Sequence, residues 1–373
     1  MRLDSLRGYL LEEALAFLLR ASGYELLTRA EDDPVELVAK ANGLNVRGRG
    51  ADHQADVLGQ LAWTPAFSRP LRLFVEAKYR RNPIGVEEMR QAVGILQDLN
   101  SRYSRRDSGG PLVRRYSYRY AIFSTSGFSR PAADYALAHE LSIVDLRVGA
   151  FHPMVEAIRL LASDVNSAMP DGRRPGIVSS VALRATLRTL LGTNTVELEP
   201  DWPERWDSPS TQEGLAVQTL LRIPEQSRGN LAEDDILPLV QACTPLAHWI
   251  AHEQPIVVGA PEAPFFLAMR PDSWTDFVAY VRQHGDHGVH AEAHIQGDRV
   301  LVSLRPQEGP GAYALRFSLP YEVEQYILGG DNTSRRLREL KRAALAHVTA
   351  SVRDRGQDRL VRLYYVPRPE TSW

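Results

Sequence analysis

Residues 71–79 have the sequence LRLFVEAKY, an apolar run that ends in Glu-Ala-Lys. Its alternating pattern and its content of Leu, Phe and Val predict a β-strand that is largely buried. Glu76 and Lys78 are two residues apart, so their side chains project from the same face of that strand. Lysine is unfavourable inside a buried strand unless it is paired or takes part in chemistry. The stretch therefore predicts a charged site on a buried strand.

A second carboxylate precedes this strand. Asp56 begins another strand candidate, residues 56–63, and nineteen residues separate it from Glu76. Hairpin pairing of the two strands would bring the carboxylates together, as a site for a hard cation such as Mg²⁺ requires. Lys78 would then hydrogen-bond an attacking water and stabilise negative charge on a phosphoryl group. The alternative is a solvated strand face on which Glu76 and Lys78 form an ordinary salt bridge, because E-x-K triplets are common.

Hydrophobic periodicity predicts the other elements of the first half. Helices are expected at residues 6–21, 86–99, 131–141 and 151–165, and further strands at residues 118–125 and 141–146. The order of these elements favours an α/β fold in which a small mixed sheet is flanked by helices. We therefore expect a first domain over residues 1–165.

The second half has a weaker pattern. Residues 166–176, NSAMPDGRRPG, have the composition of a linker. Beyond them we expect an α+β domain of unknown type over residues 177–373. Its predicted elements are a hairpin at residues 291–306, a strand at 313–320, an amphipathic helix at 335–352 and a final strand at 359–367.

Composition sets the class of protein. The chain is 44% hydrophobic and 24% charged, as expected for a globular protein. The net charge of −2 divides into +3 for residues 1–150 and −5 for the remainder, so the first half is the better candidate to meet a polyanion. Cys243 is the single cysteine, which precludes an internal disulfide and fits a reducing cytoplasm. No apolar run reaches the ~20 residues of a membrane span, so we expect no membrane partner.

Four segments of the first half resemble, in order, the Mrr-type restriction endonucleases, a branch of the PD-(D/E)XK nuclease superfamily. They are GYLLEEALAFLLRASGY (8–24), GRGADHQADVLG (48–59), LFVEAKY (73–79) and YAIFSTSGFSRPAADYALAHELSIVDL (120–146). The resemblance implies a restriction-endonuclease-like fold and hydrolysis of DNA in restriction or anti-phage defence. It also implies Mg²⁺ as the cofactor, with Mn²⁺ as a substitute.

The resemblance also implies roles for individual residues. Asp56 and Glu76 would bind the metal together with the backbone carbonyl of Ala77, and Lys78 would position the water. Glu12 would hold a second metal or a water bound to the first.

Glu13 is the alternative to Glu12 for this role. We prefer Glu12 because it shares a helix face with Leu15 and Leu19.

An arginine-rich segment lies between residues 102 and 120. Arginine binds phosphate through its planar fork and tyrosine stacks on bases, so the segment is a candidate nucleic-acid contact. The candidate residues are Arg102, Arg105, Arg106, Arg114, Arg115 and Tyr116. A solvated insertion before a strand is an equally good interpretation.

Other polar residues have weaker signals. Asp52, His53, Gln54 and Gln91 lie near the predicted site, but they are explained as well by turn capping or an exposed helix. The histidines between residues 284 and 294, and His248 with His252, have no cysteine or ordered acid beside them that would favour zinc.

The sequence leaves two rival functions open beside a DNA nuclease. One is a DNA-binding module that retains a nuclease fold without turnover. The other is an effector subunit that acts only when a partner or ligand engages the second domain. That domain would supply recognition, regulation or assembly, through a protein partner or a second copy of the chain.

Overall fold

The chain forms two compact units, each assembled from two separate stretches. One combines Met1–Phe17 with Pro153–Gln254, and the other combines Leu18–His152 with Pro255–Trp373. The computed structural model describes residues 3–41, 43–62, 64, 67–105, 111–147, 149–167, 179–193, 212–229, 231–253, 256–261, 265, 267–296, 299–329, 332–354 and 357–368. Helices and mixed β-sheets occur together, which confirms the predicted α/β class at that level.

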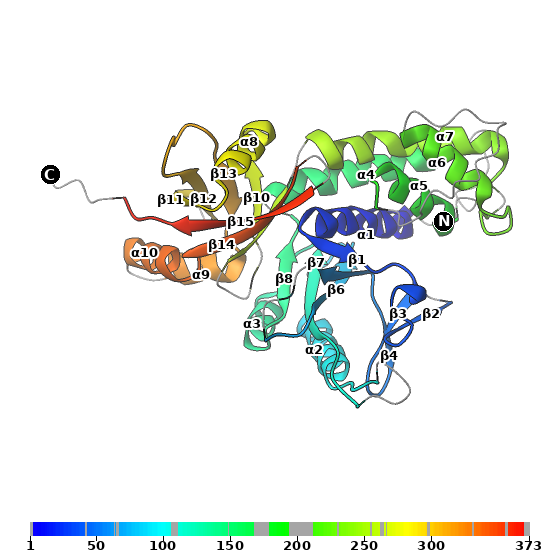
Figure 1. Ribbon diagram of the computed structural model, residues 1–373, viewed down its shortest axis with the longest axis horizontal. Helices are drawn as coiled ribbons and strands as arrows, with labels where there is room; N and C mark the ends of the chain where they lie inside the picture. Colours follow the sequence, from blue (N-terminus) through cyan, green and yellow to red (C-terminus); the bar gives the residue numbers. More distant parts are fainter. Residues whose placement is uncertain are drawn as a thin grey trace. The chain divides into compact units, whose positions relative to one another are not determined.

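A five-stranded sheet carries the predicted site. Its strands are β1 (Tyr24–Leu26), β5 (Val57–Leu61), β6 (Leu71–Lys78), β7 (Ser117–Ser124) and β8 (Ser142–Asp145), in the order β1-β5-β6-β7-β8. The pairs β1–β5 and β5–β6 are antiparallel, whereas β6–β7 and β7–β8 are parallel. The LRLFVEAK strand is therefore in the middle of a mixed sheet (Figure 1).

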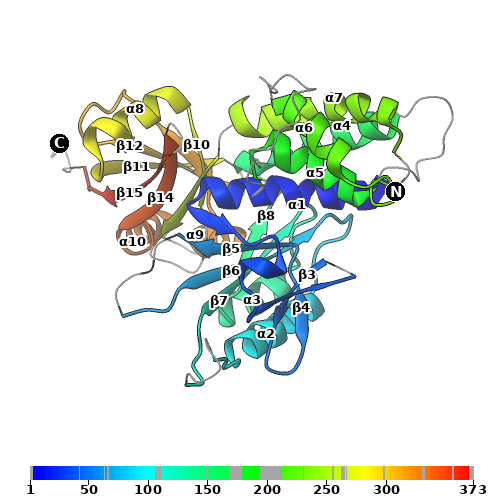
Figure 2. The ribbon, with the colours of Figure 1, turned by 45° about the vertical axis from the view of Figure 1, so that its right-hand side comes forward.

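Two helices, α2 (Val86–Asn100) and α3 (Arg130–Ala138), pack against one face of this sheet (Figure 2). The core between them contains Phe74 of β6 and Tyr120 of β7, whose rings stack with centroids 4.9 Å apart. Phe74 is two residues before Glu76, so this aromatic pair lies on the face of the sheet that also carries Glu76.

Gly59 has no side chain, which allows Leu19 to approach strand β5 closely. A Cβ atom at Gly59 would lie 3.0 Å from the Cδ2 atom of Leu19, near the end of α1 (Leu3–Ala21). Any larger residue at this position would push Leu19 away from the strand.

A three-stranded antiparallel sheet follows β1 in the chain. Its strands are β2 (Leu37–Lys40), β3 (Gly43–Arg47) and β4 (Asp52–Gln54), preceded by the short helix η1 (Ala30–Asp32). Sequence periodicity did not predict this sheet, because its strands are too short to show a clear alternation.

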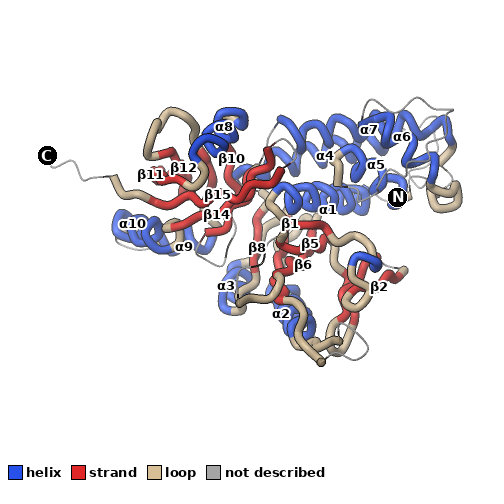
Figure 3. Tube along the Cα trace, in the orientation of Figure 1, coloured by secondary structure: helices blue, strands red, loops and turns tan. Residues whose placement is uncertain are grey.

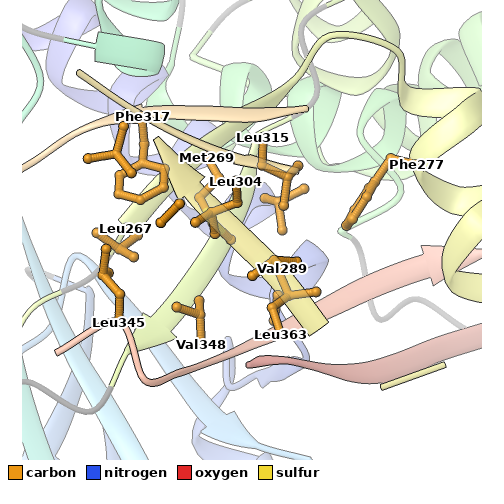
Figure 4. Close-up of a cluster of buried hydrophobic side chains, with 14 of the residues drawn as sticks. Leu267, Met269, Phe277, Val289, Leu304, Leu315, Phe317, Leu345, Val348 and Leu363 are labelled. Carbon is orange, nitrogen blue, oxygen red and sulfur yellow. The ribbon is translucent and has the colours of Figure 1, made fainter. Parts of the chain in front are cut away.

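The last part of the chain forms a closed barrel. Its strands are β9 (Val257–Pro261), β10 (Leu267–Pro271), β11 (His287–Gln296), β12 (Arg299–Pro306), β13 (Leu315–Ser318), β14 (His347–Asp354) and β15 (Gln357–Tyr365). Inward side chains such as Met269, Leu304 and Phe317 fill it (Figure 4). The helices α8 (Trp274–His284), α9 (Tyr321–Leu328) and α10 (Thr333–Ala343) accompany the strands.

One predicted element of this part is wrong. The helix expected over residues 335–352 ends at Ala343, and His347–Asp354 form strand β14. The alternation of Val348, Ala350 and Val352, all buried, places these side chains on the inner face of the barrel. The two-residue period of this segment was masked by the strong helical pattern just before it.

All the elements that the structure describes in the other unit are helical (Figure 3). They are the first part of α1, α4 (His152–Ser167), α5 (Ser180–Leu190), α6 (Gln212–Arg222), α7 (Glu233–His248) and the π-helix η3 (Trp249–Glu253). Within this unit α5, α6 and α7 pack on one another, and Leu187, Leu220 and Val240 are fully buried on them. Most of the predicted linker, residues 168–176, lies outside the described residues, so the domain boundary stays a prediction.

No helix in the described part of the chain combines the length and the apolar character needed to cross a bilayer.

Candidate functional site

The structure brings Asp56 and the Glu-Ala-Lys triplet together. Val57 of β5 pairs with Val75 of β6, so Asp56 is at the next position along the same antiparallel pair. The backbone N–H of Asp56 donates to the carbonyl of Val75 at 3.2 Å. In return, the N–H of Ala77 donates to Oδ2 of Asp56 at 2.8 Å. The hairpin expected from sequence therefore fixes the Asp56 carboxylate against the backbone of the E-x-K strand.

Glu76 and Lys78 form an ion pair between Oε1 and Nζ. The second carboxylate oxygen of Glu76 accepts a hydrogen bond from the hydroxyl of Tyr120 on β7. The Glu76 and Lys78 side chains are 26% and 21% exposed, so solvent reaches both charges. The site is thus a partly open cluster of two acids, one lysine and one phenol at the end of the central strands.

Tyr120 is a member of this cluster that the sequence did not identify. Burial raises the pKa of its phenol far above 10, and the neighbouring charges of Glu76 and Asp56 raise it further, so the hydroxyl remains a donor. The parallel register of β6 and β7 pairs Tyr120 with Phe74, which points its hydroxyl toward Glu76. The contact between Tyr120 and Glu76 follows only from this register, which pairs residues 46 positions apart in the chain.

The Tyr120→Phe variant should keep the fold and weaken the binding of Mg²⁺ at this site. The ring would still stack on Phe74, but Glu76 would lose a donor that orients its carboxylate. In a titration with Mg²⁺ we expect an increase of about tenfold in the dissociation constant, the effect typical of losing a residue that orients a metal ligand. Tyr118→Phe is the matched control, because that buried hydroxyl contacts Arg72 instead. An equal response of both variants to Mg²⁺ would remove Tyr120 from the site.

The donor set fits a hard divalent cation. Asp56 and Glu76 supply carboxylate oxygens from adjacent positions of two paired strands, the type of ligand that Mg²⁺ prefers. Glu76 is engaged by Lys78 and Tyr120, so a cation would compete with the Lys78 ammonium for Oε1. Within the described ranges, no three His, Cys, Asp or Glu side chains converge on one point. Water and substrate phosphate would therefore have to complete the coordination of a cation here.

Glu12 belongs to the helical unit and is paired there. Arg184 of α5 donates to Glu12 and, at 3.3 Å, to Oε1 of Glu13. Arg188 donates to the other oxygen of Glu13 at 2.9 Å. Glu13, not Glu12, is the fully buried acid of α1. The metal-binding role of Glu12 stays a prediction.

The arginine-rich segment is a hairpin closed by a bridge between Ser104 and Val113. Arg102, Arg114 and Arg115, at its base, bind partners within the protein. Arg102 donates to Glu36 at 3.0 Å, Arg115 to Asp33 at 2.9 Å, and Arg114 to the side chain of Asn100 at 3.1 Å. These three guanidinium groups thus serve at least in part to anchor the hairpin.

The other candidates of this hairpin differ. Tyr116 accepts the guanidinium of Arg72 over its ring, 3.4 Å from the centroid. Arg105 and Tyr103 are exposed, and Arg106 lies outside the described residues. The nucleic-acid contact predicted for this segment stays a prediction.

The anchoring carboxylates form a buried ionic network. Asp33 also accepts from Nη2 of Arg72 at 2.7 Å, and Arg72 is only 1% exposed. Burial on its own would raise the pKa of Asp33, but hydrogen bonds from Arg115 and Arg72 outweigh it and hold the pKa below its usual range. Arg72 lies on β6, four residues before Glu76 and on the same face, so the network supports the strand that carries the site.

The weaker candidates are held in local contacts. Asp52 pairs with Lys40 at 2.8 Å, and His53 contacts Asp98 at 2.8 Å. Gln54 and Gln91 are exposed on β4 and α2. Asp98 also accepts the N–H of Gly50, so His53 of β4 shares this acceptor with the backbone that precedes the strand.

The histidine-rich stretch belongs to the barrel. His287 is buried, and its Nδ1–H donates to the carbonyl of Gly285 at 2.7 Å while Nε2 accepts from Tyr313. His290 bonds to the carbonyl of Val366 at 2.8 Å. These contacts give the two histidines structural partners.

No family model, no curated protein and no solved structure matches the chain.

Proposed function

We propose that the chain is a Mg²⁺-dependent nuclease that hydrolyses phosphodiester bonds of DNA, with Asp56, Glu76 and Lys78 at its centre. The observation that carries the proposal is the convergence of these residues from β5 and β6, with Asp56 bonded to the N–H of Ala77 and Lys78 paired with Glu76. The resemblance of four ordered segments to Mrr-type nucleases supports a restriction-endonuclease-like fold for this sheet, and a role in restriction or anti-phage defence.

Each residue has a distinct task in this mechanism. Asp56 and Glu76, with the carbonyl of Ala77, would hold the cation, which supplies Lewis-acid stabilisation of the phosphoryl oxygens. Lys78, released from Glu76, would hydrogen-bond the attacking water and stabilise the negative charge that develops on the phosphate. Tyr120 would keep donating to Glu76 and thereby fix the direction of its carboxylate. The N–H of Ala77 fixes Asp56 in the same way.

A metal series tests the proposal on supercoiled plasmid DNA. Mg²⁺ and Mn²⁺ should support nicking or linearisation, and EDTA should abolish both. Ca²⁺ should support DNA binding with little turnover, because it accepts looser geometry and is a weaker Lewis acid. Undiminished cutting in excess EDTA would contradict a metal-dependent site. DNA binding without cleavage under every metal would instead favour the binding-module alternative.

A further inference from the structure

Helix α10 (Thr333–Ala343) is a locally basic element in the acidic second half of the chain. It contains five basic residues and one acid, Glu339. The helix lies beside α9 (Figure 1), within the part of the chain that forms the barrel. Its composition therefore departs from the charge of its surroundings in a way that points to a polyanionic partner.

The two sides of α10 have different environments. Leu337 and Leu340 pack against the core of the barrel. Arg335, Arg338 and Arg342 follow one another at spacings of three and four residues, and all three are exposed. This spacing aligns them along the opposite side of the helix, in a row about 10 Å long.

The arginines of α10 differ in how they are held. Arg335 bonds to Glu339 at 2.8 Å, and Arg336 lies over the ring of Tyr326 with 4.9 Å between its guanidinium and the centroid. Among the residues that the structure describes, neither Arg338 nor Arg342 has a hydrogen-bond or ion-pair partner. The row thus presents two guanidinium groups that have no partner among the described residues, beside a third that pairs with the exposed Glu339.

We infer that Arg335, Arg338 and Arg342 form a contact surface for the phosphate backbone of double-stranded nucleic acid, the α10 row. Guanidinium groups bind phosphate oxygens in a bidentate manner, and a row of them matches a regular series of phosphates. A membrane surface fits less well, because a helix that binds lipid inserts its apolar side, and here Leu337 and Leu340 on that side pack against the barrel core. The inference and the proposed nuclease function both involve nucleic acid. The inference does not require that the chain cleaves it.

The test is the salt dependence of DNA binding by the full chain in EDTA, measured by anisotropy of a labelled duplex. Each lost phosphate contact should reduce the slope of log affinity against log salt by about 0.9, so the double variant Arg338→Ala with Arg342→Ala should lose about 1.8. Between about 50 and 200 mM salt, the affinity of the wild type should therefore fall about tenfold more than that of the variant. Alanine favours helix, so α10 should remain folded.

Two controls separate this surface from general charge. Arg159→Ala with Arg316→Ala removes the same charge from exposed positions on α4 and β13, and should leave the slope unchanged. The double variant Arg338→Lys with Arg342→Lys keeps the charge and should largely preserve the wild-type slope. Equal slopes for the α10 variant and the α4/β13 control would overturn the inference. So would a selective loss of binding to anionic vesicles with duplex binding intact. Because cleavage is not measured, an inactive nuclease with a normal slope change would leave the inference standing.

Discussion

Replacing Lys78 by alanine is expected to reduce Mg²⁺-dependent plasmid cleavage by at least about 100-fold, the effect typical of losing a group that stabilises charge in the transition state. The variant removes the only ammonium that contacts Glu76 among the described residues, and with it the proposed partner of the attacking water. Asp56→Ala and Glu76→Ala should be at least as severe. Combining any two of these variants should add little, because residues that act as one unit are not additive.

Lys40→Ala is the matched control for this experiment. Lys40 also belongs to the unit that contains the sheet and also pairs with a carboxylate, Asp52, at 2.8 Å, but it is on β2. Its variant should cleave at the wild-type rate. Thermal melts of both variants would show that the fold is intact. Wild-type cleavage by Lys78→Ala would exclude the E-x-K strand as the catalytic centre, whatever the metal series gives.

The parts of the site that could be predicted are those formed by residues close together in the sequence. The strand at residues 71–79 and the pairing of Asp56 with it followed from local alternation and a short connection, and the structure places both as expected. Tyr120 could not be found this way, since its contact with Glu76 depends on the register of a parallel pair separated by a helix. Parallel strands are joined by long crossovers, so sequence proximity gives no guide to their register.

The charge of the arginine-rich hairpin was also hard to predict from sequence, because its partners are distant in the chain. A run of arginines between residues 102 and 115 predicted a basic surface, because their partners could not be recognised. Those partners, Glu36 and Asp33, come from a loop 66 and 82 positions before Arg102 and Arg115, and both acids are buried. A count of charge along the sequence therefore overestimated the free positive charge of this segment.

The Arg72→Met variant should destabilise the sheet by about 3 kcal/mol, because it leaves the buried Asp33 carboxylate with fewer partners. Arg72 is 1% exposed, donates to Asp33 at 2.7 Å and also bonds to Gln60 and Tyr118. Methionine keeps most of the volume and removes the charge. Native-state hydrogen exchange of peptides from β6 and β7 measures the loss locally, which matters because a chain of two units need not unfold in one step.

The pH dependence of this effect has a definite sign. The folded pKa of Asp33 is lowered, so its ion pairs stabilise the fold above the unfolded pKa of about 3.9 and the stabilisation is lost as pH falls through the folded pKa. The difference in protection between wild type and Arg72→Met should accordingly be full at neutral pH and shrink below about pH 4. Arg90→Met, at an exposed arginine that pairs with the exposed Glu87, is the control and should cost less than about 0.5 kcal/mol. A loss for Arg72→Met that is no greater than this control, or one that persists unchanged in acid, would mean that packing rather than the buried charge pair holds β6 in place.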